Sequence, residues 1–285
     1  MSNGSSRAAG DGFAPITPAR LQWHDHTPVA TDFDDAYFSR LDGRGESIWV
    51  FLDGNQLEQR FAGLADGDQF VIGETGFGTG LNMLLAAACF LEHAPATARL
   101  HLWSVEKHPL RREEVAHALA PWPNLGAPAS ALLDQYPPAS PGYHRLQLAD
   151  NITLTLMLGD ATALWRQCPA RVDAWFLDGF APSRNPDMWC PALFAELAAP
   201  SPPRATLAPF AAARFVRPAL LDAALDTPPR PGFATTCPTL PRPFRDAPRH
   251  PAPLQPAQPP TARPPLALPP PTRPPAQPGA PRPPP

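Results

Sequence analysis

The stretch FVIGETGFGTGLN at residues 70–82 constrains the fold of this chain more than any other feature. An apolar run ends at Glu74, glycines occupy every second position at Gly76, Gly78 and Gly80, and a run of helix-forming residues follows. Glycine has no Cβ and accepts positive φ, so the chain can turn tightly and approach a ligand closely. The helix that follows presents unpaired N–H groups at its start. Strand, glycine turn and helix in this order predict a nucleotide-binding turn.

Strand-like and helix-like runs alternate from residue 69 to about residue 226. Such alternation predicts a parallel sheet with helices on both faces, and right-handed crossovers favour a doubly wound order. The run VDAWFLDGF is nearly all apolar, as expected for a strand that is buried on both faces. We therefore predict an α/β fold with a Rossmann-like, mainly parallel sheet. The strand-like runs are QFVIGE, RLHLWSVE, ITLTLMLGD, VDAWFLDGF and ATLAPF.

Segments of different composition flank this main domain, which we assign to residues 70–226. Residues 1–18 predict a disordered leader. Residues 19–69 predict a small N-terminal extension, in which the run IWVFL at residues 48–52 favours a strand. Residues 227–285 contain 24 of the 44 prolines. Because proline breaks helices and cannot donate to a sheet, this tail is expected to be polyproline II or disordered.

The charges are as uneven as the prolines. The tail carries seven arginines against one acid, a charge of +6, and the whole chain carries −3, which leaves −9 for residues 1–226. An acidic body excludes broad, nonspecific affinity for nucleic acid. An RNA substrate would therefore have to be held by a local patch.

The spacing of the cysteines and the length of the apolar runs indicate the cellular compartment in which the protein is expected. The four cysteines are scattered, without a CxxC pair or ligand-like histidine spacing, which indicates reduced thiols and no metal site. The start of the chain lacks the apolar core of a signal peptide. The longest apolar run, LNMLLAAACFLEH, is shorter than the ~20 residues of a membrane span. We expect a cytoplasmic protein without a membrane partner.

The glycine spacing favours one class of nucleotide. A dinucleotide fingerprint reads G-x-G-x-x-G, whereas this loop reads G-x-G-x-G after Glu74. A nucleoside without phosphate fits better, and S-adenosylmethionine is one, with Glu74 near its positively charged end. Glu106 ends the second strand, where an acid accepts hydrogen bonds from ribose hydroxyls. Asp160, at the end of the third strand, is where methyltransferases use an acid on the adenine amino group; a plain turn residue is the alternative.

A further acid, Asp178, follows the apolar strand AWFL. Aspartate at the end of a buried strand is costly unless it has a partner or a function. Facing a sulfonium, its carboxylate could bind the cofactor and act as the general base for an attacking amine. Phe180 could stack on a flat base, and Arg184 could meet phosphate or base edges. For Arg184 the alternative is a rigid, proline-rich connection.

Five segments resemble, in order, the methyltransferase domain of the bacterial bifunctional protein family that builds 5-methylaminomethyl-2-thiouridine in tRNA. The resemblance covers roughly residues 21–221, and no single motif carries it alone. The segments are FDDAYFS, VFLDGNQLEQRF, FVIGETGFGTGLN, GDA and DAWFLDGFAPSRNPDMW.

The resemblance implies methyl transfer from S-adenosylmethionine to the 5-aminomethyl group of wobble uridine, with the tRNA anticodon loop as partner. It implies that the three glycines form the cofactor loop, that Glu106 and Asp160 contact ribose and adenine, and that Asp178 is the catalytic carboxylate. It also implies that Tyr37 and Asn55 close over cofactor or substrate.

The chain departs from the family at its end. The family has a terminal hairpin rich in lysine and arginine after a PGF sequence, whereas this chain continues ATTCPTLPRPFRD into prolines. No flavin-binding domain follows, so we expect no flavin in this chain; a separate flavin-dependent partner enzyme could supply the other half-reaction. Loss of the hairpin would leave an open sheet edge.

Two other functions compete with a tRNA methyltransferase. A nicotinamide-dependent oxidoreductase would use the same loop, but the glycine spacing and Glu74 disfavour it. An inactive or truncated methyltransferase-like scaffold would recruit SH3-like partners through its proline-rich tail, and alanine at Asp178 would then change nothing.

Overall fold

The computed structural model describes residues 15–210, 213–223 and 225. The chain divides into two units, residues 1–247 and 248–285, and every described residue belongs to the first. The predicted proline-rich tail and the predicted leader up to residue 14 lie outside the described residues.

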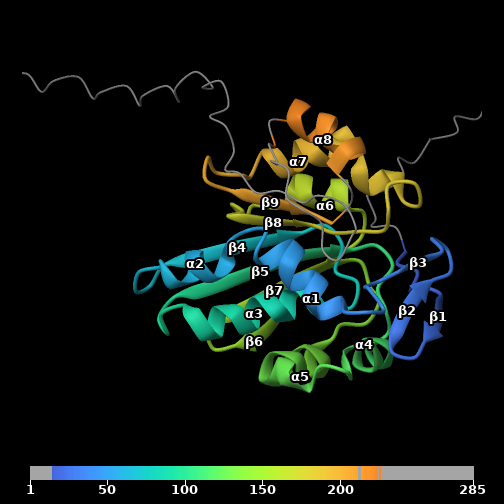
Figure 1. Cartoon of the computed structure of the whole chain (residues 1–285), viewed down its shortest axis with the longest axis horizontal. Coiled ribbons are helices and arrows are strands. Elements are labelled where there is room, and N and C mark those ends of the chain that lie inside the picture. The colour runs from blue at the N-terminus through green and yellow to red at the C-terminus, as the bar shows by residue number, and fades with distance from the viewer. Residues whose placement is uncertain (1–14, 211–212, 224, 226–285) are drawn as a thin grey trace, which may run out of the picture. The chain divides into compact units, whose positions relative to one another are not determined.

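The strands form two sheets (Figure 1). They are β1 (Leu21–His24), β2 (Thr27–Ala30), β3 (Asp35–Ala36), β4 (Gln69–Glu74), β5 (Arg99–Glu106), β6 (Gly142–Ala149), β7 (Ile152–Leu158), β8 (Ala174–Leu177) and β9 (Thr206–Pro209). The α-helices are α1 (Gly43–Ser47), α2 (Leu57–Ala62), α3 (Leu81–His93), α4 (Arg112–Leu119), α5 (Gly126–Gln135), α6 (Ala161–Gln167), α7 (Pro191–Ala198) and α8 (Ala213–Asp222). Three short helical segments are η1 (Ile48–Leu52), η2 (Pro123–Leu125) and η3 (Pro186–Trp189).

The larger sheet has the strand order β6-β7-β5-β4-β8-β9. All neighbouring strands are parallel except β6 and β7. The first parallel strand, β4, lies inside the sheet; the chain proceeds outward to β5 and β7, then returns to the other side of β4 for β8 and β9. This reversal of direction defines a doubly wound sheet, so the predicted fold class is confirmed.

Side chains alternate between two apolar layers along the sheet. In β8, Ala174 and Phe176 belong to one buried cluster, whereas Trp175 and Leu177 belong to the other. The first cluster is covered by η1, α2, α3, α4 and α5, and the second by α6, α7 and α8 (Figure 1). A strand buried on both faces explains why the run VDAWFLDGF has so little polar alternation.

The expectation of a strand at residues 48–52 was wrong. The run IWVFL forms η1, a π-helix that continues α1, and Asp53 N–H donates to Ile48 O at 2.9 Å. Val50, Phe51 and Leu52 are buried against the sheet. Large apolar residues are common in strands because they fit a half-buried pleated surface. Here the same residues form a helix whose apolar side chains pack on the sheet, so the residue types alone did not distinguish the two structures.

The antiparallel strand β6 is an element that the sequence analysis did not predict. Its residues alternate, with Tyr143, Arg145 and Gln147 exposed and Leu146 and Leu148 buried. This alternation, with period two, is typical of a strand that is half exposed. β6 pairs along nearly the whole of β7 and forms one edge of the sheet.

No helix within the described residues is long and apolar enough to cross a bilayer.

Gly73 in the central strand β4 makes a close approach that generates a stability prediction. A Cβ at this position would lie 2.5 Å from the ring of Trp175 on β8. Overpacking of this kind costs about 1–3 kcal/mol, so we expect Gly73→Ala to lower the free energy of unfolding by that amount in urea denaturation.

Gly63→Ala is the matched control for this variant. Gly63 is exposed at the end of α2, has a φ of −87°, and would place its Cβ no closer than 3.3 Å to another group. The free energy of unfolding of the Gly63→Ala variant should differ from that of the wild type by no more than about 0.5 kcal/mol. Equal effects of the two substitutions would contradict the packing argument.

Candidate functional site

A cavity of about 300 Å³ lies at the carboxyl ends of the central strands, within the size range of small-molecule sites. Its walls come from the loop after β4, from the ends of β5, β7 and β8, and from residues around β3. Ligands of doubly wound sheets bind at this place, where the strand order reverses. Seven predicted site residues line the cavity: Tyr37, Gly76, Gly78, Glu106, Asp160, Asp178 and Phe180.

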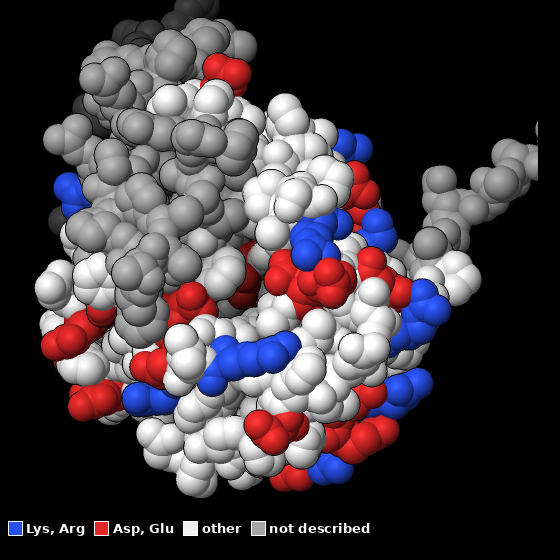
Figure 2. Space-filling view, turned by 45° about the vertical axis from the view of Figure 1, so that its right-hand side comes forward, with Lys and Arg blue, Asp and Glu red and all other residues white. Residues whose placement is uncertain are grey.

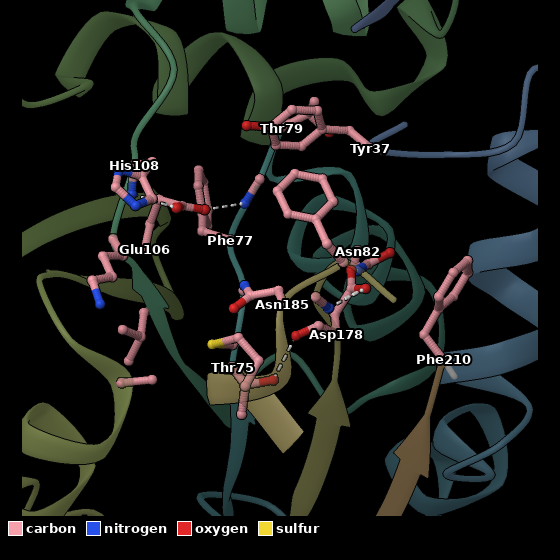
Figure 3. Close-up of a pocket in the computed structure, with 18 of the residues that line it drawn as sticks. Tyr37, Thr75, Phe77, Thr79, Asn82, Glu106, His108, Asp178, Asn185 and Phe210 are labelled. Carbon is pink, nitrogen blue, oxygen red and sulfur yellow. Dashed lines mark hydrogen bonds between the residues drawn. The ribbon is translucent and has the colours of Figure 1, made fainter. Parts of the chain in front are cut away.

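Glu106, at the end of β5, holds the glycine loop as well as facing the cavity (Figure 3). Its Oε2 accepts a hydrogen bond from Gly78 N–H at 2.9 Å, and its Oε1 accepts one from His108 N–H at 2.7 Å. Gly78 has a φ of +54°, and a Cβ there would lie 3.0 Å from the ring of Tyr37. A carboxylate has about four acceptor positions, so Glu106 can still accept hydrogen bonds from ligand hydroxyls.

Asp160 lies exposed at the rim, after β7. Its Oδ1 accepts a hydrogen bond from Ala163 N–H at 3.2 Å and so caps α6, and its Oδ2 lies 3.3 Å from Lys107 Nζ. The turn function that the sequence left open is therefore present, in addition to a position on the cavity wall.

Asp178 follows β8 and reaches the cavity from the opposite side. Its Oδ1 accepts a hydrogen bond from Gly179 N–H at 2.8 Å, and its Oδ2 accepts one from Asn82 Nδ2 at 2.7 Å (Figure 3). Burial raises the pKa of the Asp178 carboxyl to about 6, although both hydrogen bonds act in the opposite direction. The group is thus mainly ionised at pH 7 and can still accept a proton.

Glu74 does not line the cavity, contrary to the expectation that it faces the cofactor. Its side chain is completely buried at the end of β4. Oε1 accepts a hydrogen bond from Asn82 Nδ2 at 3.0 Å, and Oε2 accepts one from Ser104 Oγ at 2.6 Å. Burial and the nearby charge of Asp178 raise the pKa of Glu74 well above its usual range. Asn82, which links the two carboxyl groups, was not predicted.

Aromatic side chains form one wall of the cavity. The ring of Phe180 stacks on Phe33 with centroids 4.7 Å apart, and the edge contact with Tyr37 has centroids 5.1 Å apart. Burial raises the pKa of the Tyr37 hydroxyl, so this side chain stays neutral. Phe33, the first residue of the quoted FDDAYFS segment, was not singled out as a site residue, because only its stacking on Phe180 shows that it belongs to the wall.

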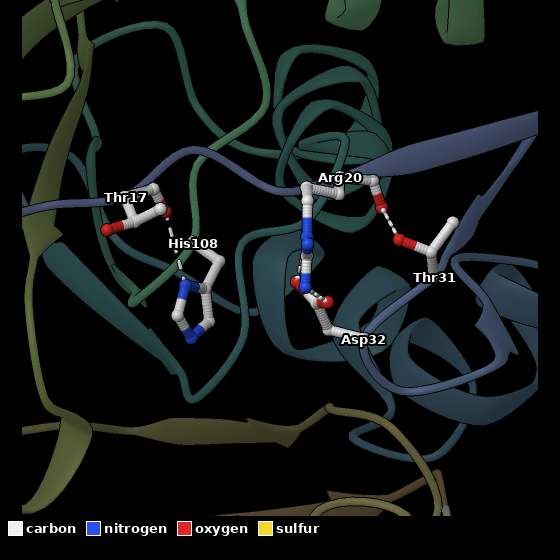
Figure 4. Close-up of polar contacts among 5 residues, drawn as sticks. All are labelled: Thr17, Arg20, Thr31, Asp32 and His108. Carbon is white, nitrogen blue, oxygen red and sulfur yellow. Dashed lines mark hydrogen bonds and ion pairs between the residues drawn. The ribbon is translucent and has the colours of Figure 1, made fainter.

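Polar contacts join residues 17–32 to one another and to His108, which lines the cavity (Figure 4). His108 Nδ1 lies 3.2 Å from Thr17 O, and Thr31 Oγ1 donates to Arg20 O at 3.1 Å. Arg20 also pairs with Asp32. Farther along, Asp35 Oδ2 accepts a hydrogen bond from Ala181 N–H at 3.0 Å, which joins the extension to the loop after β8.

Besides Glu74, three predicted residues lie outside the cavity lining: Gly80, Arg184 and Asn55. Gly80 lies behind the loop, at the start of α3. Arg184 is exposed, pairs with Asp34 and donates to Phe33 O at 3.3 Å, so it braces the outer side of the aromatic wall. Its predicted contact with substrate stays a prediction.

The expectation that Asn55 closes over a ligand was wrong. Asn55 is completely buried between η1 and the sheet. Its Nδ2 donates to Phe51 O at 3.0 Å and to Trp175 O at 3.2 Å, and its Oδ1 accepts a hydrogen bond from Thr206 Oγ1 at 2.5 Å. These bonds use the polar atoms of the side chain to join three elements, so its function is structural.

We therefore expect Asn55→Ala to affect stability and not binding. Because Phe51 O, Trp175 O and Thr206 Oγ1 would lose a buried partner, the free energy of unfolding should fall by about 2–3 kcal/mol. The affinity for S-adenosylhomocysteine, measured by calorimetry below the unfolding transition, should stay within about twofold. Lost affinity with unchanged stability would restore the binding function.

The three cysteines within the described residues do not line the cavity. Cys89, Cys168 and Cys190 form no disulfide, and Cys237 lies outside the described residues. Burial raises the pKa of Cys89 to about 11 and raises that of Cys168 as well. Among the described residues, no group of His, Cys, Asp and Glu side chains is arranged to hold a metal ion.

Comparison with known proteins agrees with this geometry. A family model described as S-adenosyl-L-methionine-dependent methyltransferase matches residues 123–240. The chain is 51% identical over 222 residues to the tRNA 5-methylaminomethyl-2-thiouridine biosynthesis bifunctional protein MnmC of Chromohalobacter salexigens, covering 76% of this chain and 32% of that protein. It is 52% identical over 217 residues to the protein of the same name from Pseudomonas aeruginosa strain UCBPP-PA14, covering 75% and 33%.

The chain thus spans about one third of the length of these curated relatives. The crystal structure of MNMC2 from Aquifex aeolicus is similar with a TM-score of 0.60 and 18% identity, over 81% of this chain and 71% of that one, which shows the shared fold. By sequence, the chain is similar to S-adenosyl-L-methionine-dependent methyltransferases and to the part of the bifunctional tRNA-modification proteins with which it aligns.

Proposed function

We propose that this chain transfers a methyl group from S-adenosylmethionine to the 5-aminomethyl group of 5-aminomethyl-2-thiouridine at the wobble position of tRNA, forming 5-methylaminomethyl-2-thiouridine. One observation carries the proposal: the glycine loop, Glu106 and Asp178 line a single cavity at the switch point of the sheet. The names of the relatives at about 50% identity supply the substrate class.

The cavity suits a nucleoside that carries a positive charge and no phosphate. Glu106 can accept hydrogen bonds from the two ribose hydroxyls, and Asp160 can accept one from the adenine amino group. The backbone at Gly78 has no side chain that would fill the space beneath the Tyr37 ring. Acidic residues on the wall would repel a pyrophosphate, which disfavours the nicotinamide alternative. S-Adenosylmethionine supplies a methyl group on a positively charged sulfur.

Asp178 has the properties that methylation of an amine requires. An amine near pH 7 is mainly ammonium and has no free electron pair. The Asp178 carboxylate accepts a proton from this nitrogen, whose electron pair then forms the bond to the methyl carbon. The carbon–sulfur bond breaks and its electron pair stays on sulfur. Fixed donors, Gly179 N–H and Asn82, hold the carboxylate in position.

The aromatic wall offers a surface for the substrate base. Phe180 and Phe33 are stacked on each other at the mouth of the cavity, and base–aromatic stacking tolerates the modified uracil because every base has a π-face. Figure 2 shows acidic and basic side chains interspersed around a hollow on the face in view. Recognition of tRNA through individual contacts, with Arg184 as one candidate, fits this surface better than a uniformly basic patch.

The direct test is methylation of tRNA that bears 5-aminomethyl-2-thiouridine. We expect the purified chain to convert it with S-adenosylmethionine, and Asp178→Asn to lower kcat by about 10²–10⁴-fold because the general base is lost. S-Adenosylhomocysteine binding by Asp178→Asn should stay within about threefold, since this product has no sulfonium charge. The function is refuted if the wild-type chain binds neither ligand, or if Asp178→Asn keeps full activity.

The raised pKa of Asp178 gives a pH dependence that needs no tRNA. Because the ionised carboxylate attracts the sulfonium and the protonated one does not, affinity for S-adenosylmethionine relative to S-adenosylhomocysteine should rise as the pH is raised through about 6. Calorimetric titrations between about pH 5 and pH 7.5 would measure this ratio. Asp178→Asn should make the ratio independent of pH; an unchanged pH dependence in that variant would assign the effect to another acid.

A further inference from the structure

On the cavity wall, one amide group lies between two carboxyl groups. Asn82 Nδ2 is 3.0 Å from Glu74 Oε1 and 2.7 Å from Asp178 Oδ2, and Figure 3 shows the contact with Asp178. An amide NH₂ has two hydrogens, so Asn82 can give one to each carboxyl group. The three residues come from the first turn of α3, the end of β4 and the residue after β8.

Glu74 and Asp178 together fix which end of the Asn82 amide faces them. The ionised Asp178 carboxylate only accepts hydrogen bonds, and Glu74 Oε1 accepts the second amide N–H, so a turned amide would set its oxygen against the Asp178 carboxylate and lose both bonds. The side chain of Glu74 cannot turn away, because it is completely buried and its Oε2 is held at 2.6 Å from Ser104 Oγ. Asn82 itself is only 7% exposed. The amide is therefore locked with its nitrogen toward the two acids.

We propose that Asn82 is the positioning residue for Asp178, directing its carboxylate into the cavity and stabilising its ionised form, and that Glu74 acts only through Asn82. This inference rests on the proposed methyl transfer and adds to it the groups that set the strength of the base.

The charges around Asp178 explain why such a donor is needed. Burial and the charges of Glu46 on α1 and Glu106 on β5 disfavour the ionised form of Asp178. Two donors oppose them, the Gly179 N–H and the Asn82 amide. The first belongs to the backbone, so Asn82 is the side chain through which the sequence sets the protonation of Asp178.

The test is the pH–rate profile of tRNA methylation. In Asn82→Ala, the lost hydrogen bond should move the lower midpoint of the profile upward by about one pH unit, and kcat at pH 7 should fall at least about tenfold. Asn82→Ser, which keeps one donor, should restore part of both effects. Asn151→Ala is the matched control: Asn151 bonds to Ala98 O at the opposite end of the sheet, and its profile should match the wild type.

A double-mutant cycle tests the role of Glu74. Glu74→Gln offers either an oxygen or an NH₂ group to Asn82 and so releases the amide orientation; it should lower kcat severalfold in the wild-type background and have no further effect in Asn82→Ala. An equal loss in both backgrounds would mean that Glu74 acts independently and would overturn that part of the proposal.

A measurement on the unaltered protein covers the case in which the Asn82 variants fail to fold. The side-chain NH₂ signals of Asn82 in a ¹H–¹⁵N spectrum should titrate with the midpoint of the wild-type pH–rate profile, and Asp178→Asn should abolish this titration. Signals that do not titrate, or an Asn82→Ala profile that coincides with the wild type, overturn the inference while leaving methyl transfer intact. A wild-type chain without methylation activity refutes the proposed function instead.

Discussion

Two carboxyl groups, the buried Glu74 and the partly buried Asp178, lie at the carboxyl ends of β4 and β8, and the surrounding groups stabilise them. An unpaired buried carboxylate costs several kcal/mol. In this chain every oxygen of Glu74 and Asp178 has a hydrogen-bond donor, supplied by Asn82, Ser104 and Gly179. These donors come from α3, β5 and the loop after β8, so satisfying the two acids requires the three segments to meet at one place.

The strand order makes this meeting geometrically natural. β4 lies between β5 and β8, and the parallel direction brings the carboxyl ends of all three strands to the same edge. Three residues therefore become neighbours in space: Glu74 before the loop, Ser104 near the end of β5, and Asp178 after β8. About 100 residues separate Glu74 from Asp178 in the sequence. The glycine loop then folds back over them, held by Glu106 through Gly78 N–H.

The sequence was sufficient for the parts of the fold that follow a local pattern. The apolar strands, the glycine turn and the position of Glu106 and Asp178 on the cavity wall could be predicted, because each stands at a fixed place relative to a strand end. The run IWVFL could not, since a strand and a helix covering a sheet both favour large apolar residues. The comparisons support the methyltransferase interpretation over the nicotinamide one.

Site residues that depend on distant partners were the ones that sequence reasoning missed or misplaced. Asn55 stands beside a turn-like sequence, yet its partners Trp175 and Thr206 lie more than 100 residues away. In the sequence, Asn82 is an ordinary residue at the start of a helix, and only the fold shows its contacts with Glu74 and Asp178. Phe33 gains its meaning only from stacking on Phe180. None of these contacts follows a residue spacing that can be recognised in a single sequence.

The wall that the extension contributes has a consequence for the order in which the protein matures. Tyr37 and Phe33 leave the ribosome early, whereas Phe180 and Asp178 follow some 140 residues later. Contacts of such long sequence separation form late in folding, so a nascent chain has no complete nucleoside pocket until β8 has been synthesised and paired. A ligand that contacts both an early and a later segment would bind only the folded domain, and would therefore stabilise it relative to incompletely synthesised chains.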